Sequence, residues 1–234
     1  MTITKELYIR IMDIVADTLE TNPEDVEGLF IDDEVLDGMS PEDSYIYTNI
    51  EKRIAVNVEG LDMGMTKLVI TDRDLSFVIK IPFTGLFHMP YDYANQEYEE
   101  PVLSYRANCD ILDEEEGMYN WLPDELLDII VPNIYVGNYG CLPIYIQKKM
   151  NYAPCKIRSS ERSLEYVDER GDYEEEFIDS LITRFGIQGA INRIDLMNEN
   201  LEDLHNGNYG CDKYGNGYIF DYGGYNSCMW EEVS

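Results

Sequence analysis

The chain has 234 residues and a mass of 27.1 kDa, and its 47 acidic side chains outnumber its 17 Lys and Arg, giving a formal net charge of -30. This charge excludes direct nucleic-acid binding through phosphate neutralisation, which requires a basic face. Because 44% of the residues are hydrophobic and 12% aromatic, we expect a folded chain rather than an acidic disordered one. No apolar stretch approaches the roughly 20 residues of a membrane span, so we expect a cytoplasmic protein without membrane association.

The acidic charge itself has two interpretations. In the first, the carboxylates form a solvated surface that keeps the protein soluble through self-repulsion. In the second, rows of carboxylates imitate DNA phosphates and bind the basic groove of a protein partner. Acidic residues are dense in segments 1–50 and 161–179 and are not confined to a tail. Composition therefore keeps both interpretations open.

The five cysteines are scattered along the chain, and no two of them form a Cys-x-x-Cys pair that would indicate a zinc site. They are Cys109, Cys141, Cys155, Cys211 and Cys228. We expect reduced thiols that serve mainly in packing.

The first 50 residues are predicted to be helical. In segment 3–19 apolar residues recur at helical spacing with charged residues between them, which indicates an amphipathic helix. Asn22-Pro23 and Ser40-Pro41 each place a capping side chain before a proline suited to a first helical turn, and acidic residues follow. We expect a short helix to start at each.

Segment 53–83 changes to short β-rich runs broken by glycines and by Asp72-Arg73-Asp74, which predicts an antiparallel meander. The sequence after residue 103 predicts further helices and strands. The expected helices are 104–122, 123–130, 174–185 and 188–196, and the expected strands are 142–147, 208–211 and 217–221. The last two strands form a hairpin, and Gly186 separates the last two helices.

The segment from Leu201 to Gly224 is the most informative about chemistry. Asp203, in Asp-Leu-His-Asn-Gly-Asn, is followed by Asn208 and, after the predicted hairpin, by Asp221-Tyr-Gly-Gly. This spacing resembles the catalytic and metal-binding loops of the protein-kinase-like superfamily, in the form seen in aminoglycoside phosphotransferases, atypical kinases and small phage-encoded kinases. The resemblance implies that Asp203 faces the acceptor hydroxyl while Asn208 and Asp221 hold Mg²⁺ on the phosphates of ATP.

An upstream strand supports the resemblance. Phe77-Val-Ile-Lys80-Ile resembles the Val-Ala-Ile-Lys strand, whose lysine binds the α- and β-phosphates. Gly60 and Gly64 lie in the preceding hairpin, where kinases carry a loop that covers the phosphates. The Glu that pairs with the lysine is expected in Asp113-Glu-Glu-Glu116, with Glu115 on the inward face and Glu114 and Glu116 as alternatives.

The strand at 142–147 resembles the one that leads into the inter-lobe hinge of the superfamily, whose backbone contacts the adenine. The resemblance implies that Tyr145 lies near the gatekeeper position and that Gln147 and Lys149 lie at the hinge. An ordinary edge strand accounts for the same residues nearly as well.

The chain departs from the superfamily in four respects. Leu201 and Glu202 precede Asp203, where the families commonly show His-Arg or His-Gly. The phosphate loop lacks Gly-x-Gly-x-x-Gly, Tyr222 replaces the Phe of the metal loop, and only 13 residues follow Asp221. We therefore expect an α+β, two-lobed kinase-like fold with a truncated C-terminal lobe. The expected parts are an acidic helical extension at 1–50, an N-lobe-like antiparallel sheet with one helix at 51–147, and a helical C-lobe at 148–234.

Two functional hypotheses follow from these patterns. In the first, a kinase, expected to be phage-encoded, binds Mg·ATP and transfers the γ-phosphoryl group to a hydroxyl. In the second, a non-catalytic kinase fold blocks the basic groove of a host nuclease or defence protein with its acidic surface. A structural virion protein is a third, less specific alternative.

Overall fold

The computed structural model describes residues 2–30, 44–46, 58–63, 67–88, 91–92, 94–98, 102–107, 109–150, 175–201 and 208–222. The chain divides into two compact units, which are described separately. The first unit comprises Met1–Leu112 and Ile134–Ile146, and the second comprises Asp113–Asn133 and Gln147–Ser234. Both strands and helices are present, so the mixed α+β class expected from the sequence is confirmed.

The predicted N-terminal helix is present as α1 (Lys5–Leu19). Thr4 caps it by accepting a hydrogen bond from the Leu7 amide, and Glu20 ends it in the left-handed conformation. A 3₁₀ helix, η1 (Val26–Leu29), follows the Asn22-Pro23 signal, while the signal at Ser40-Pro41 lies outside the described residues. Helix α1 belongs to the first compact unit.

The first unit contains a five-stranded sheet in the order β2-β3-β4-β10-β9. Its strands are β2 (Val58–Met63), β3 (Leu68–Asp72), β4 (Phe77–Ile81), β10 (Leu142–Lys148) and β9 (Asn133–Tyr139). The pairs β2·β3 and β3·β4 are antiparallel, as the predicted meander requires. Strand β10, predicted from 142–147, lies next to β4 although the two are far apart in the sequence.

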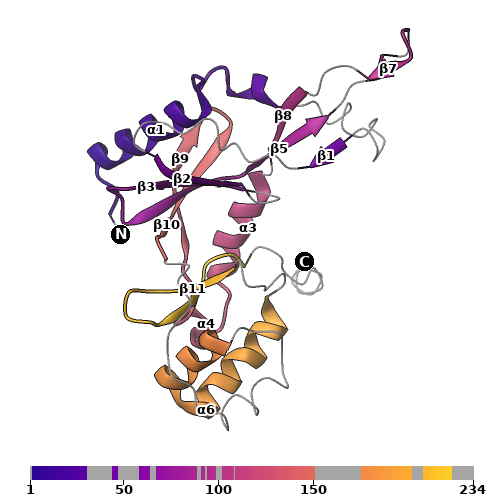
Figure 1. Cartoon of the computed structure of the whole chain (residues 1–234). Helices are drawn as coiled ribbons and strands as arrows, with labels where there is room; N and C mark the ends of the chain where they lie inside the picture. Colours follow the sequence, from indigo (N-terminus) through magenta and orange to yellow (C-terminus); the bar gives the residue numbers. More distant parts are fainter. Residues whose placement is uncertain are drawn as a thin grey trace. The chain divides into compact units, whose positions relative to one another are not determined.

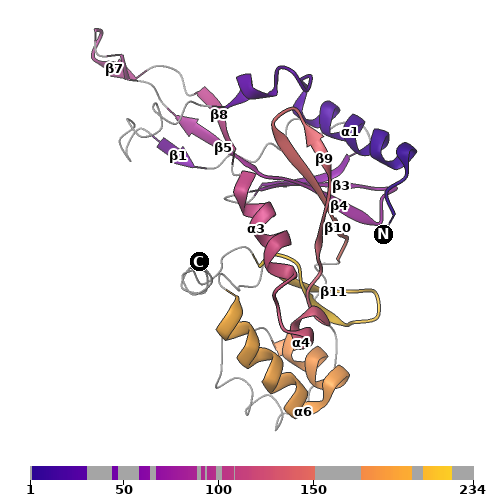
Figure 2. The ribbon, with the colours of Figure 1, turned by 180° about the vertical axis from the view of Figure 1, so that it is seen from behind.

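One face of this sheet packs with α1 into a single hydrophobic core, and Figures 1 and 2 both show α1 lying along the sheet. Strand β4 contributes Ile79 and Ile81 to this core, and β10 contributes Ile144 and Ile146. Because alternate residues of a strand point to opposite faces, the residues between these isoleucines project away from α1.

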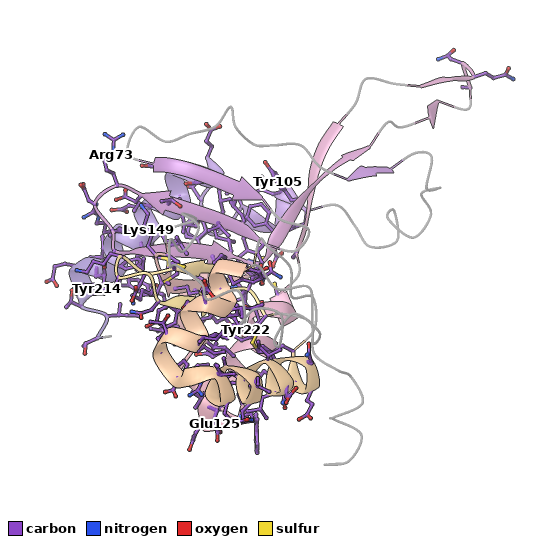
Figure 3. The ribbon with its side chains drawn as sticks, turned by 60° about the horizontal axis from the view of Figure 1, so that its bottom comes forward. Arg73, Tyr105, Glu125, Lys149, Tyr214 and Tyr222 are labelled. Atoms are coloured by element: carbon purple, nitrogen blue, oxygen red, sulfur yellow. The ribbon has the colours of Figure 1, made fainter. Side chains whose placement is uncertain are left out.

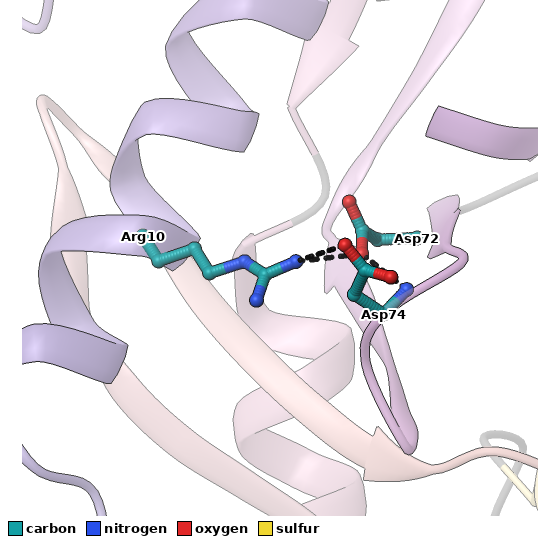
Figure 4. Close-up of polar contacts among 3 residues, drawn as sticks. All are labelled: Arg10, Asp72 and Asp74. Atoms are coloured by element: carbon teal, nitrogen blue, oxygen red, sulfur yellow. Dashed lines mark hydrogen bonds and ion pairs between the residues drawn. The ribbon is translucent and has the colours of Figure 1, made fainter. Parts of the chain in front are cut away.

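An ion-pair cluster joins α1 to the turn between β3 and β4 (Figure 4). The Arg10 guanidinium donates to Asp72 at 3.1 Å and to Asp74 at 3.3 Å. Asp72 is buried, and its Oδ1 also accepts the Asp74 amide. A buried carboxylate requires such partners, so Arg10 helps to hold the helix against the sheet.

A second sheet in the first unit corrects one prediction. It has the order β1-β5-β8, with β1 (Ser44–Ile46), β5 (Phe83–His88) and β8 (Val102–Ala107), and β6 (Tyr91–Asp92) pairs separately with β7 (Glu97–Tyr98). The helix predicted over 104–122 is therefore wrong at its start, because α3 begins only at Cys109 and ends at Tyr119. Tyr105 packs edge-on against Phe83 at 5.1 Å between ring centroids, a tertiary contact that favours the strand.

The second unit is built from helices and one hairpin. Besides α3 from Asp113 onward it contains α4 (Asp124–Leu127), α6 (Glu175–Asn200), β11 (Tyr209–Cys211) and β12 (Gly217–Ile219). Gly186 interrupts α6 with φ 73° and ψ 169°, so the prediction of two helices around this glycine is confirmed. The hairpin predicted from 208–221 is also confirmed, and α6 contacts both of its strands.

Among the described cysteines, one in the hairpin differs from the expectation. Cys211 is disulfide-bonded, so the expectation of reduced thiols is wrong there, whereas Cys109 and Cys141 are free. Among the described residues, no helix is both long enough and apolar enough to cross a membrane.

Candidate functional site

Lys80 is the candidate phosphate-binding residue of the first unit, and it lies in the middle of a buried strand. It alternates in β4 with Ile79 and Ile81, which face α1, so its side chain projects to the opposite face of the sheet. Only 3% of its surface is exposed. An ammonium group at such a position is costly unless it has polar partners, which distinguishes Lys80 from an ordinary surface lysine.

Tyr145 lies on the neighbouring strand and shares that face. It alternates in β10 with Ile144 and Ile146, which belong to the core with α1, and β10 is hydrogen-bonded to β4. Tyr145 is fully buried, its ring lies 5.5 Å from that of Tyr135, and its hydroxyl has no hydrogen-bond partner among the described residues. The sheet thus places two buried polar side chains, predicted independently from the sequence, on one face.

The other hinge and loop candidates differ in their surroundings. Gln147 belongs to the second unit, where its buried amide donates to the Val131 carbonyl at 2.7 Å, and Lys149 is partly exposed. Gly60 lies in β2 opposite Thr71, at an irregularity in the pairing with β3. Gly64 lies outside the described residues.

In the second unit, the two predicted metal ligands flank the same end of the hairpin. Tyr209 pairs with Ile219, so Asn208 and Asp221 lie just beyond the last strand pair. The Asn208 carbonyl accepts the amides of Phe220 at 2.9 Å and of Asp221 at 3.3 Å. These bonds therefore hold the main chains of Asn208 and Asp221 next to each other, although the two residues are well separated in sequence.

A buried polar cluster lies in the same unit. Glu115, on α3, is 1% exposed, and its Oε2 accepts a hydrogen bond from Nδ2 of Asn133. Glu116 is partly exposed, and the side chain of Glu114 lies outside the described part. Of the three candidates, Glu115 is therefore the carboxylate that the structure shows to be buried, which agrees with its expected inward orientation.

Tyr222 is the third member of this cluster. Burial raises the pKa of its hydroxyl well above the ordinary value, and the negative charge of Glu115 adds to the shift. The main-chain N–H of Asn133 is close enough to oppose the shift, but it does not form a hydrogen bond of normal geometry with the hydroxyl. Figure 3 shows Tyr222 among the side chains of the unit, in contrast to Tyr214, which is 76% exposed.

The described residues thus form two groups. The first unit brings together Lys80 and Tyr145, and the second contains Glu115 together with Asn208 and Asp221. The remaining catalytic candidate, Asp203, lies outside the described residues.

Asn133 has no counterpart among the predicted site residues. It is an isolated polar residue at the start of an unpredicted strand, so nothing in its sequence context indicated a partner as distant as Glu115. Tyr222 had a visible signal, because it directly follows Asp221. Its burial against Glu115 could not be predicted, since it depends on how distant segments pack.

The side-chain oxygens of Asn208 and Asp221 are of the kind found in magnesium sites that use few protein ligands. Mg²⁺ prefers oxygen ligands and keeps several waters or phosphate oxygens, so one carboxylate and one amide oxygen are suitable donors. Over the described ranges, no cluster of three or more His, Cys, Asp or Glu suited to a metal is present. Asn208 and Asp221 therefore remain the residues that would hold Mg²⁺ if the resemblance is correct, and the structure shows their main chains next to each other.

No protein-family model matches the chain, and a search of curated proteins finds no match. The inference about function therefore rests on the residues and their arrangement.

Proposed function

We propose that the protein is a kinase-like phosphotransferase with the two-lobed fold of that superfamily, which binds Mg·ATP and transfers the γ-phosphoryl group to a hydroxyl acceptor. In this proposal Lys80 binds the ATP phosphates and is positioned by Glu115. Asn208 and Asp221 hold Mg²⁺, and Asp203 orients and deprotonates the acceptor. Positioning and charge neutralisation then account for most of the rate enhancement.

The observation that carries the proposal is the pairing of β4 with β10. The resemblance to the superfamily implies that Lys80 contacts the phosphates and that the segment beginning at Tyr145 contacts the base. One nucleotide can contact both only if their strands are neighbours and both side chains project from one face. The first unit meets this condition, although strands β5 to β9 and helices α3 and α4 lie between the two strands along the chain.

The hairpin of the second unit gives independent support. In protein kinases an Asp and an Asn from two different loops hold Mg²⁺. The backbone bonds between Asn208 and the 220–221 segment keep the two corresponding residues of this chain next to each other, which supports the proposal. When bound, Mg²⁺ neutralises the charge that develops on the transferred phosphoryl group. This neutralisation matters in a chain with a net charge of -30, which otherwise repels a nucleotide.

The proposal can be tested by the thermal stability of the protein with and without Mg·ATP. A ligand that binds only the native state stabilises it by about 2.7 kcal/mol at a free concentration of about 100 times Kd. We expect millimolar Mg·ATP to raise the melting temperature of the wild type and of Asp124→Ala. Asp124→Ala is the matched control, because it removes an exposed carboxylate from α4 of the same unit. Asp221→Ala is expected to lose the shift.

Two outcomes would contradict the proposal. One is a wild-type melting temperature that does not change with Mg·ATP. The other is a shift that Asp221→Ala retains in full and that does not depend on Mg²⁺. Either result would favour a non-catalytic role in which the acidic surface binds a basic protein partner.

A further inference from the structure

A group of basic and aromatic side chains lies at the β11–β12 hairpin of the second unit. The ring of Tyr218, in β12, has two cations beside it: the Lys148 ammonium lies 5.2 Å from the ring centroid and the Arg184 guanidinium 4.8 Å. At the turn, the Lys213 ammonium lies 4.9 Å from the centroid of the Tyr214 ring. These distances are typical of cation–π contacts, so each cation is held beside a ring. We call these five residues, all of the second unit, the hairpin surface.

The three cations of the hairpin surface form no ion pair with a carboxylate in the part of the chain that the structure describes. Arg184 donates instead to two main-chain oxygens, those of Gly217 and Asp128, each at 3.0 Å. The Asp128 carboxylate lies 2.7 Å from Arg193, whose positive charge neutralises it. The charge of Arg184 is therefore not cancelled by its own contacts.

The acidic residue of the turn, Asp212, is engaged by the turn itself. Its oxygens accept the Tyr214 and Asn216 amides at 2.8 and 3.0 Å and the Asn216 side chain at 3.0 Å. The hairpin surface thus has three cations against one carboxylate, and that carboxylate is already held by hydrogen bonds. An excess of positive charge remains there, in a chain whose net charge is -30.

Charge and aromatic rings together indicate what this surface binds. A free phosphate is bound where several donors converge on its oxygens. Here the cations are spread over two rings, and both terminal nitrogens of Arg184 already bind main-chain oxygens. An extended peptide instead places successive side chains about 3.4 Å apart along its axis, so several carboxylates can each meet a separate cation. Tyr214, which is 76% exposed, offers a ring on which an apolar side chain of the peptide can pack.

We propose that the hairpin surface is a docking site for an acidic, extended segment of a partner protein. Carboxylates of the segment contact Lys148, Arg184 and Lys213, and an apolar side chain packs on Tyr214. The site lies within one unit and requires no nucleotide, so it goes beyond the proposed phosphoryl transfer. Its partner is opposite in charge to the basic protein that the remaining acidic surface would bind.

The test is the affinity of the whole protein for a short fluorescein-labelled peptide of repeating Glu-Tyr, measured by fluorescence polarisation without nucleotide. A repeating Gln-Tyr peptide is the control ligand, because it keeps the rings and lacks the carboxylates. Both are measured at physiological ionic strength, where the Debye length of about 8 Å screens the repulsion from more distant acidic residues. We expect the Glu-Tyr peptide to bind more tightly than the Gln-Tyr peptide.

Two exposed lysines of the hairpin surface can be replaced without removing contacts that support the fold. Lys148→Gln and Lys213→Gln each remove one exposed cation. Lys5→Gln is the matched control, because it removes an exposed lysine from α1 of the first unit and changes the net charge by the same amount. We expect each hairpin variant to weaken Glu-Tyr binding about threefold and the double variant about tenfold, as for exposed charge pairs, and Lys5→Gln to leave it unchanged. Tyr214→Ser should weaken the binding of both peptides.

Equal binding of the two peptides by the wild type would overturn the docking site, as would an equal loss in Lys5→Gln and the hairpin variants. Binding of tripolyphosphate or of phosphatidylserine vesicles, lost in Lys148→Gln and Lys213→Gln while the Glu-Tyr peptide does not bind, would assign the surface to phosphate groups or to a membrane instead. Self-association that both variants abolish would assign it to a second copy of the chain. Because no nucleotide is present, none of these results decides whether the protein binds Mg·ATP.

Discussion

The two compact units position their candidate residues by different means. In the first unit, Lys80 and Tyr145 project from regular strands, and the alternation of buried isoleucines determines the face on which they lie. In the second unit, Asn208 and Asp221 flank a hairpin, and Glu115 meets Asn133 and Tyr222 in a buried cluster. The face on which a strand residue lies can thus be inferred from the hydrophobic alternation of that strand. The contacts of a loop or helix residue in a buried cluster depend instead on tertiary packing.

The largest expected effect is a loss of Mg·ATP affinity, tested by replacing each of two buried lysines of the first unit. Lys80→Met should lower the affinity for Mg·ATP by about a hundredfold or more, ~3 kcal/mol, because it removes charge-assisted hydrogen bonds to phosphate. Lys67→Met removes a lysine of similar burial without a predicted role in binding. Isothermal titration of folded variants measures both affinities. Equal losses in the two variants would show that Lys80 acts only through the stability of the sheet.

The turn between β9 and β10 should be the most sensitive glycine position. Gly140 has φ +59°, and a Cβ there would lie 2.2 Å from the Pro23 carbonyl oxygen, a backbone atom that cannot move aside cheaply. We expect Gly140→Ala to lower the free energy of unfolding by about 2 to 4 kcal/mol. Gly28→Ala, where the added methyl meets open space, is the control and should change stability little. Urea unfolding, monitored by hydrogen exchange in peptides of the first unit, measures the difference in the free energy of unfolding between the two variants.

A glycine in the second unit should be more tolerant. At Gly217 an added Cβ would lie 2.7 Å from the Phe177 ring and 2.8 Å from the Ser180 hydroxyl, but both are side-chain atoms. We therefore expect Gly217→Ala to cost about 1 to 2 kcal/mol, less than Gly140→Ala. Hydrogen exchange in peptides from α6 and the hairpin provides the measurement, with Gly117→Ala as an unhindered control in the same unit. A cost equal to that of Gly140→Ala would contradict this ranking.

The smallest expected effect concerns the pH dependence of the hairpin turn. Desolvation alone would raise the pKa of Asp212, but hydrogen bonds from the Asn216 side chain and from the Asn216 and Tyr214 amides, together with Lys148, lower it below 3.8. A carboxyl group whose pKa is lower in the folded state stabilises the fold above the unfolded pKa, and this stabilisation is lost as the pH falls through the folded value.

Asp212→Asn should therefore reduce stability at pH 7 by about 0.5 kcal/mol, a value kept small because solvent screens the turn. Urea titrations at several pH values should show the difference from the wild type decreasing below pH ~4. A difference that instead grows as the pH falls would have the wrong sign for a lowered pKa.

Elements with a regular pattern were predicted well from the sequence. The run around Lys80 predicted β4, the turn residues at 213–216 predicted the hairpin, and Gly186 predicted the break in α6. These successes share a physical basis, because strand alternation, turn chemistry and a glycine in an otherwise helical pattern are local properties.

The failures depend on distant segments. Val102–Ala107 is a strand because it pairs with β5, and its own sequence does not exclude a helix. Asn133 belongs to the polar cluster only because Glu115 packs against it. Residues that match a motif could be identified from their spacing in the sequence. Residues that contact them, such as Asn133 beside Glu115, could be identified only from the folded structure.

The most direct test of the account uses an acyl phosphate of ATP, whose acyl group transfers to a lysine amine near the phosphates. The amine attacks the acyl carbonyl, an amide bond forms, and ATP leaves as the acyl–oxygen bond breaks. The account predicts Mg²⁺-dependent acylation of Lys80, found by mass spectrometry, that excess ATP suppresses and Asp221→Ala weakens. Acylation spread over exposed lysines, or labelling of Lys80 that ATP does not suppress, would contradict it.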